Sequence, residues 1–148
     1  MKYSQILAAI DLSEENDRII ETAAQMARDS GATLHLMSVF RPLGQVYGGI
    51  NMAMVADQTI SFEKQAREQA TAQLVELGGK YGVEPDNIHV CLGQPAAEIR
   101  RLAETLNADL VVMGTHGRHG VGLLLGSTAS GVLHGVSCDV LALKLKKE

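Results

Sequence analysis

The chain has 148 residues, the usual size of one domain, so we expect a single domain spanning residues 1–148 with a core that needs neither disulfides nor metal ions. Apolar residues make up 46% of the chain but aromatic residues only 3%, which indicates an aliphatic core of the kind found in parallel sheets covered by helices. The formal net charge of −4 excludes a broad basic surface, so we expect neither nucleic acid nor a membrane as a partner.

The first residues and the two cysteines favour a cytoplasmic location. The chain opens on a short apolar run without the long apolar region of a signal peptide, and no stretch approaches the roughly 20 apolar residues of a membrane span. Cys91 and Cys138 lie far apart, with neither CxxC spacing nor a flanking His at metal-ligand spacing. We interpret both as small core residues and predict no metal site.

Apolar periodicity predicts strands and helices in strict alternation. Short continuous apolar runs are typical of strands buried on both faces, whereas apolar residues at i, i+3, i+4 and i+7 indicate helices. In chain order the sequence predicts a strand at 6–10, a helix at about 14–30, a strand at 33–39, a helix at 57–81, a strand at 88–92, a helix at about 95–106, a strand at 110–113, a helix at about 127–136 and a strand at 140–145. This alternation indicates a parallel sheet with right-handed crossovers and helices on both faces.

Particular residues indicate where these helices begin and end. Ser13 can cap the first helix, whose first turn would then carry Glu14 and Glu15, and Gly31 supplies its C-terminal stop. Pro95 falls in the first turn of the third helix, where its missing N–H does no harm.

The connection between the second strand and the long helix is unusual. Residues 40–56 follow neither periodicity and include Met52 and Met54. Connections of this length in a compact domain tend to be functional or mobile. We therefore predict that this segment is a mobile lid or a dimer contact.

The glycine-rich segment after the fourth strand, residues 114–126, is the strongest candidate for a ligand site. In open parallel sheets ligands bind outside the carboxyl ends of the strands, where the strand order reverses. If the first and fourth strands are neighbours there, Asp11 and Gly114 flank one crevice. Glycines allow backbone N–H groups to turn toward a phosphate, and the following helix begins with free amides and hydroxyls at Ser127 and Thr128.

Basic residues in this segment support the prediction of a phosphate site, and known phosphate-binding motifs offer a comparison. Arg118, with His116 or His119, could add local positive charge. The segment contains no Gly-Lys-Ser/Thr and so is not a P-loop, and it lacks the spacing of a dinucleotide fingerprint. The simpler interpretation is a flexible loop followed by an ordinary helix cap at Ser127.

Several stretches resemble the universal stress protein family. The chain is identified as a member over nearly its whole length by Ile6–Ser13, Gly93–Ile99, Asp109–Gly117, Gly126–Ser127 and the closing strand Cys138–Leu143. The resemblance implies an open five-stranded parallel sheet in the order 3-2-1-4-5, with helices on both faces, in a Rossmann-like adenine nucleotide alpha hydrolase-like fold.

The resemblance also implies a pocket for ATP or AMP, optionally with Mg²⁺. Asp11 would lie beside the ribose or adenine, although as a residue after a strand it could equally be a turn or cap residue. Val39 would offer backbone groups to the base, and Gly114 would approach the ribose and phosphates. The implied binding residues are Ala9, Asp11, Val39, Met113, Gly114, His116, Gly117, Arg118, Gly126, Ser127 and Thr128.

The glycine spacing departs from the family pattern. ATP-binding members read Gly, two residues, Gly, nine residues, Gly, then Ser or Thr, whereas here Gly117 and Gly126 enclose the eight residues 118–125. Gly120 and Gly122 could absorb the deletion by letting the loop close more tightly. Members without this loop do not bind nucleotide.

Three hypotheses about function follow. The first is a stress-response module that binds ATP or AMP, and the second a dimeric adaptor without nucleotide. The third is a slow ATP hydrolase in which Asp11 or His116 aligns water, although the sequence shows neither paired carboxylates nor a Walker lysine, so no catalytic residue is assigned. Family members dimerise through their last strand, and an exposed sheet edge favours such pairing, so we predict a homodimer through Val140–Leu145.

Overall fold

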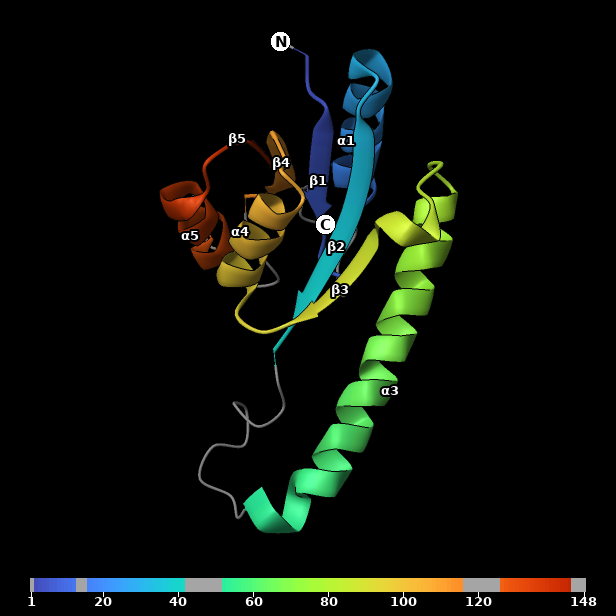
Figure 1. Ribbon diagram of the computed structural model, residues 1–148, viewed down its shortest axis with the longest axis vertical. Helices are drawn as coiled ribbons and strands as arrows, with labels where there is room; N and C mark the ends of the chain where they lie inside the picture. Colours follow the sequence, from blue (N-terminus) through green and yellow to red (C-terminus); the bar gives the residue numbers. More distant parts are fainter. Residues whose placement is uncertain (1, 13–15, 42–51, 116–125, 145–148) are drawn as a thin grey trace.

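The computed structural model describes residues 2–12, 16–41, 52–115 and 126–144, with side chains omitted for residues 52–59. Figure 1 shows the strands and helices in the predicted alternation. In chain order they are β1 (Gln5–Ala9), α1 (Asp17–Ser30), β2 (Thr33–Phe40), α3 (Met52–Gly79), the short 3-10 turn η1 (Pro85–Asn87), β3 (Ile88–Leu92), α4 (Pro95–Thr105), β4 (Leu110–Gly114), α5 (Ser127–Gly135) and β5 (Asp139–Leu143).

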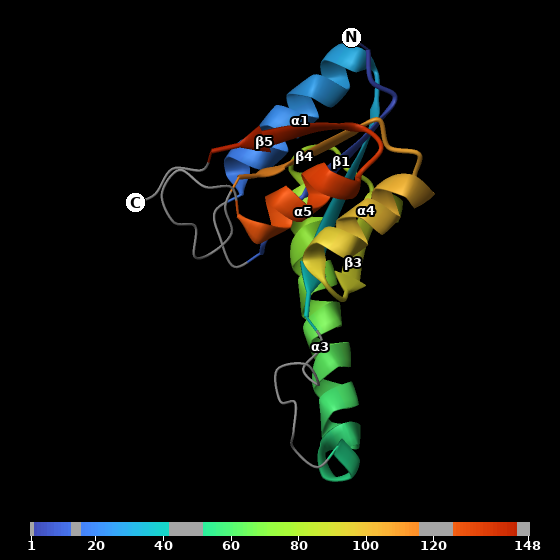
Figure 2. The same cartoon turned by 90° about the vertical axis from the view of Figure 1, so that its left-hand side faces the viewer.

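The strands form one parallel sheet in the order β3-β2-β1-β4-β5, which confirms the order implied by the family resemblance. β1 is central, with Leu7 beside His35 of β2 on one side and Val111 of β4 on the other. Helices α1 and α3 pack on one face of the sheet, and α4 and α5 pack on the other (Figures 1 and 2).

The alternation of side chains along the strands divides the core into two layers. Ile6 and Ala8 of β1 point toward α1 and α3, whereas Leu7 and Ala9 point toward α4 and α5. Every residue of β1 after Gln5 is buried, because the strand has a neighbour on each side and helices on both faces. Aliphatic side chains therefore fill both layers, as the composition predicted.

The start of α1 differs from the prediction. The helix begins at Asp17 rather than near Glu14, and its N-cap is Asn16, whose carbonyl accepts the first helical hydrogen bond from Ile20 at 3.1 Å. Ser13, the predicted cap, lies outside the described residues. The side chain of Asn16 is bonded to the backbone of Asp11, five residues earlier in the chain, and the helix begins directly after Asn16. The stop at Gly31 is confirmed, with a φ of 69°.

Helix α3 begins earlier than predicted, at Met52 instead of residue 57, so Met52 and Met54 belong to the helix. The expected lid or dimer contact over 40–56 falls largely on residues 42–51, outside the described part of the chain. The helix has 28 residues, roughly 42 Å, and its first half extends beyond the sheet (Figures 1 and 2). Its second half packs on the sheet through the buried Leu74.

The two cysteines differ in burial. Cys91 on β3 is buried, as predicted, and burial raises the pKa of its thiol. Cys138, just before β5, is only partly buried, so the prediction that it is a core residue is wrong in part. It follows the short turn after α5 and packs at the margin of the core beneath α4 and α5.

Two histidines form a hydrogen-bonded pair inside the sheet. His35 Nδ1 lies 3.2 Å from Nε2 of His89, and His35 Nε2 lies 3.0 Å from Oε1 of Gln5. These contacts fit the interpretation of both as structural histidines. Burial lowers the pKa of both imidazoles, and the neighbouring His89 lowers the pKa of His35 further.

We expect the unfolding free energy to fall on acidification through this pair. A lowered pKa means that the unfolded chain binds more protons than the folded chain between the lowered value and about 6.5. Stability from the neutral pair is therefore complete above about pH 6.5 and is lost as the pH falls toward the folded pKa. Urea unfolding from pH 5 to 8 measures the slope. His89→Gln should flatten it, whereas replacing the exposed His134 with Gln should not; equal slopes would contradict the prediction.

Candidate functional site

A cleft opens at the carboxyl edge of the sheet, where the strand order reverses between β1 and β4. It is open to solvent and contains about 690 Å³ of empty space, its open mouth included. The chain leaves β1 for α1 on one face and β4 for α5 on the other, so the ends of these strands diverge and leave the crevice. The predicted location of the ligand site therefore coincides with a real cleft.

The structure brings many of the predicted site residues together. Those on the cleft wall are Ala9, Asp11, Val39, Met113, Gly114 and Thr128. Gly126 and Ser127 lie at the start of the same helix as Thr128 but not on this wall. His116, Gly117 and Arg118 fall outside the described residues. The prediction that Asp11 and Gly114 flank one crevice is confirmed.

The inner wall of the cleft is apolar and its rim is polar. Met37 and Ile99 are buried residues that face it from β2 and α4. Asp11 is exposed at the rim, just beyond the end of β1, and Ser38 is buried beside it. Such a wall suits a flat apolar group, while the carboxylate can accept hydrogen bonds from hydroxyls.

Backbone hydrogen bonds hold the N-terminus of α5 at the cleft. Gly126 is the N-cap, and its N–H donates to the carbonyl of Thr115 at 2.7 Å. The N–H of Thr115 donates in turn to the carbonyl of Leu143 at the end of β5, at 2.8 Å. The two ends of the glycine-rich segment are therefore joined at its base. The first amides of a helix have no acceptor within the helix and carry its positive dipole end, so they can receive an anion.

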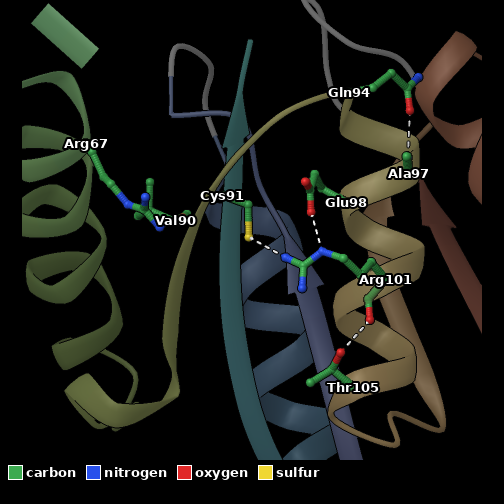
Figure 3. A network of polar contacts seen from close by, with 8 residues as sticks. All are labelled: Arg67, Val90, Cys91, Gln94, Ala97, Glu98, Arg101 and Thr105. Carbon is green, nitrogen blue, oxygen red and sulfur yellow. Dashed lines mark hydrogen bonds and ion pairs between the residues drawn. The ribbon is translucent and has the colours of Figure 1, made fainter. Parts of the chain in front are cut away.

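Polar contacts orient the first turn of α4, which forms another wall (Figure 3). Oε1 of Gln94 accepts from the N–H of Ala97 at 2.6 Å, and this cap leaves Pro95 facing the cleft. Glu98 is ion-paired with Arg101 at 2.6 Å. Gly93 has a φ of 154°, and a Cβ there would meet Oε1 of Glu98 at 2.7 Å, so the turn requires glycine.

Asn16 is a cleft residue that the sequence interpretation missed. It is 6% exposed, lines the cleft, and bonds to the backbone of Asp11 through its side chain. The available signal was that Asn is a preferred N-cap residue, but Ser13 offered the same chemistry at a nearby position. Only the folded geometry separates the two.

A second cleft lies across the end of β2, toward α3. It shares Asp11, Ser38 and Val39 with the first cleft, and its far wall is the face of α3 that carries Ala66 and Ala70. Asp11 therefore stands at the boundary between the two clefts.

The part of the chain that the structure describes contains neither a cluster of metal ligands nor a membrane-spanning helix. Within residues 2–12, 16–41, 52–115 and 126–144, no three His, Cys, Asp or Glu side chains gather as metal ligands. In the same ranges, no helix has the length and apolar character to cross a membrane.

Known proteins match both the sequence and the fold. Residues 2–144 match the profile of the Universal stress protein family. Universal stress protein A homolog 1 of Coxiella burnetii is 38% identical over 147 residues, which cover 99% of this chain and 100% of the relative.

Two solved structures are similar over the whole chain. The hypothetical protein MJ0577 has a TM-score of 0.80 at 21% identity and full coverage of both chains. A universal stress protein solved in complex with cAMP has a TM-score of 0.66 at 22% identity, with coverage of 99% and 100%. At these identities the likeness shows the fold. Together with the family profile and the 38% identical relative, it leads to one conclusion: this chain belongs to the universal stress protein family.

Proposed function

We propose that this universal stress protein is a stress-response module that binds an adenine nucleotide, ATP or AMP, in the cleft between β1 and β4. The observation that carries the proposal is the convergence of the apolar wall, the Asp11 carboxylate and the N-terminus of α5 on one cleft at the reversal point of the sheet.

The proposed pose divides the nucleotide among these three features. The base lies against the apolar wall, with its edge toward the backbone of Val39. The ribose hydroxyls donate to Asp11. The phosphates meet the first amides of α5 and the hydroxyls of Ser127 and Thr128, where the helix dipole favours negative charge. His116, Gly117 and Arg118 are proposed to contact the phosphates from the glycine-rich segment, with Mg²⁺ accompanying ATP.

The shorter glycine spacing is compatible with this proposal. The hydrogen bond between Gly126 and Thr115 joins the ends of the segment close to the cleft. A deletion of one residue therefore shortens the segment between these two ends. The amides of α5, which receive the phosphate in the proposed pose, keep their position.

The test is to identify what the purified protein holds and binds. Denaturing fresh protein and analysing the released small molecules by mass spectrometry should reveal near-stoichiometric ATP, ADP or AMP. Calorimetry on nucleotide-free protein should then rank ATP, AMP and cAMP, the last chosen because a protein of the same fold was solved with it. Accumulation of ADP from added ATP would favour a hydrolase. A protein that is empty and binds none of the three would contradict the proposal and favour the adaptor.

We further propose a homodimer through the last strand, predicted as Val140–Leu145. In the described part of the chain, β5 pairs only with β4, so its other edge presents backbone donors and acceptors. Its residues from Val140 to Ala142 are partly buried. A second copy that adds its own β5 would satisfy these groups.

We expect Val140→Lys to convert the dimer into a monomer. A charged side chain within a strand-pairing contact must be desolvated or excluded, which disfavours association. Light scattering coupled to size exclusion measures the mass. Phe62→Lys, an equally drastic change at an exposed position on α3, is the control and should leave the dimer intact. If the Val140 variant remained a dimer, the interface would have to lie elsewhere than β5.

A further inference from the structure

We propose that Asn16 is a positioning residue for the nucleotide site, because it holds the peptide backbone of Asp11 and so fixes the carboxylate at the rim of the cleft. This inference rests on the proposed function. It assigns a role to a buried residue that the family resemblance did not include.

The Asn16 side chain forms two hydrogen bonds to a single residue. Its Nδ2 donates to the carbonyl oxygen of Asp11, and its Oδ1 accepts from the N–H of Asp11 at 3.3 Å. The side-chain amide thus satisfies both backbone groups of Asp11, much as a neighbouring strand would. This pairing also sets the orientation of the amide, because only one of its two rotations places a donor opposite the carbonyl.

Asp11 lies beyond the end of β1, where the paired register with β2 stops. The last backbone bond between this part of the chain and β2 is the one from the N–H of Ile10 to the carbonyl of Met37, at 2.9 Å. One residue further on, at Asp11, the side-chain amide of Asn16 bonds to the backbone instead of β2. The Asp11 side chain is exposed and lies at the boundary between the two clefts. The position of its backbone therefore decides which of the two clefts the carboxylate faces.

Asn16 is itself rigidly placed. It is 6% exposed, and as the N-cap of α1 it is held by the bond from Ile20 to its carbonyl. Because the Asn16 side chain is anchored at the start of a helix, it allows the backbone of Asp11 little motion. A ligand that binds to a pre-positioned carboxylate loses less conformational entropy on binding than one that must order it.

Two other roles are possible for a buried Asn at this place, and they predict different energetics. If Asn16 touches the nucleotide directly, its contribution to binding does not depend on Asp11. If it only caps α1, its replacement changes stability but not affinity. The positioning role alone predicts that the effect of Asn16 on affinity disappears when the Asp11 carboxylate is absent.

The experiment is a double-mutant cycle of Asn16→Ser and Asp11→Ala, with the Kd for AMP measured by calorimetry. Serine is also a preferred N-cap, so α1 keeps its start, but its side chain is too short to bridge both backbone groups of Asp11. Asn16→Ser should raise the Kd about tenfold, no more than Asp11→Ala does, and should add nothing in the Asp11→Ala background. Amide exchange at Asp11 should be faster in ligand-free Asn16→Ser than in the unmodified protein.

Controls separate this role from a structural one. Ser30→Ala changes a buried polar residue at the other end of the same helix and should leave the Kd unchanged. Should Asn16→Ser fail to fold, the same cycle is run with Asn16→Thr, which is also a preferred N-cap, adds no charge and is too short to bridge both backbone groups of Asp11. Additive effects on Kd, or unchanged exchange at Asp11, would overturn the positioning role while nucleotide binding stands. If the unmodified protein binds no adenine nucleotide, both proposals fail.

Discussion

Gly126→Asp is expected to weaken nucleotide binding at least about a hundredfold while the protein folds normally. A carboxylate at this N-cap would stand within a few ångströms of the proposed phosphate position, where two like charges repel by about 4 kcal/mol at a partly exposed site. Folding should be unaffected because Gly126 has a φ of −63°, which any residue can adopt, and Asp is a preferred N-cap. Calorimetry with AMP and ATP measures the loss.

A neutral variant at the same position isolates the effect of charge. Gly126→Asn has nearly the same size and also caps helices well, so we expect its Kd to rise only a few-fold. ATP should lose more affinity than AMP in the Asp variant, because it carries more negative charge. If the Asn and Asp variants were equally weak, the cause would be steric, and the proposed phosphate position at the start of α5 would need revision.

Leu7→Ala is expected to lower the unfolding free energy by about 2–5 kcal/mol, a large fraction of the roughly 5–15 kcal/mol of a typical domain. Leu7 is fully buried on the central strand and packs in the layer beneath α4 and α5. Truncation removes apolar contacts and leaves a cavity that neighbours on both adjacent strands cannot fill by moving. Urea unfolding measures the shift in midpoint.

Phe62→Ala is the matched control for this stability loss. Phe62 is a larger apolar residue, but it is 59% exposed, in the first half of α3. Its truncation should change the unfolding free energy by no more than about 0.5 kcal/mol. A large loss at Phe62 would mean that this surface is covered, for instance by a second copy of the chain.

The order and type of the elements could be predicted from the sequence because they depend on local patterns. Two such patterns are the apolar run at 110–113 and the helical spacing before Gly31. Each involves only residues that are close together in the chain. Both appear where expected, as β4 and α1. The strand order, by contrast, came from the family resemblance, since periodicity does not say which strands are neighbours.

Element boundaries were predicted less well than element types. Ser13 and Asn16 are both good caps, and α1 begins directly after Asn16, at Asp17. At α3 residues 52–56 are all apolar, so they lack the spacing of apolar among polar residues that marks an amphipathic helix, and the helix begins at Met52. In neither case does the apolar periodicity mark the boundary.

The amino-acid sequence alone determined that this chain alternates strands and helices, has an aliphatic core and carries a glycine-rich turn before a helix, because each of these follows from neighbouring residues. The family resemblance implied that Ala9, Val39, Met113 and Thr128 share a pocket, but only the tertiary structure places them on the wall of one cleft and shows the side chain of Asn16 bonded to the backbone of Asp11 there. The reason is that the cleft depends on which strand ends are neighbours in the assembled sheet, and the apolar pattern of each strand does not contain that information.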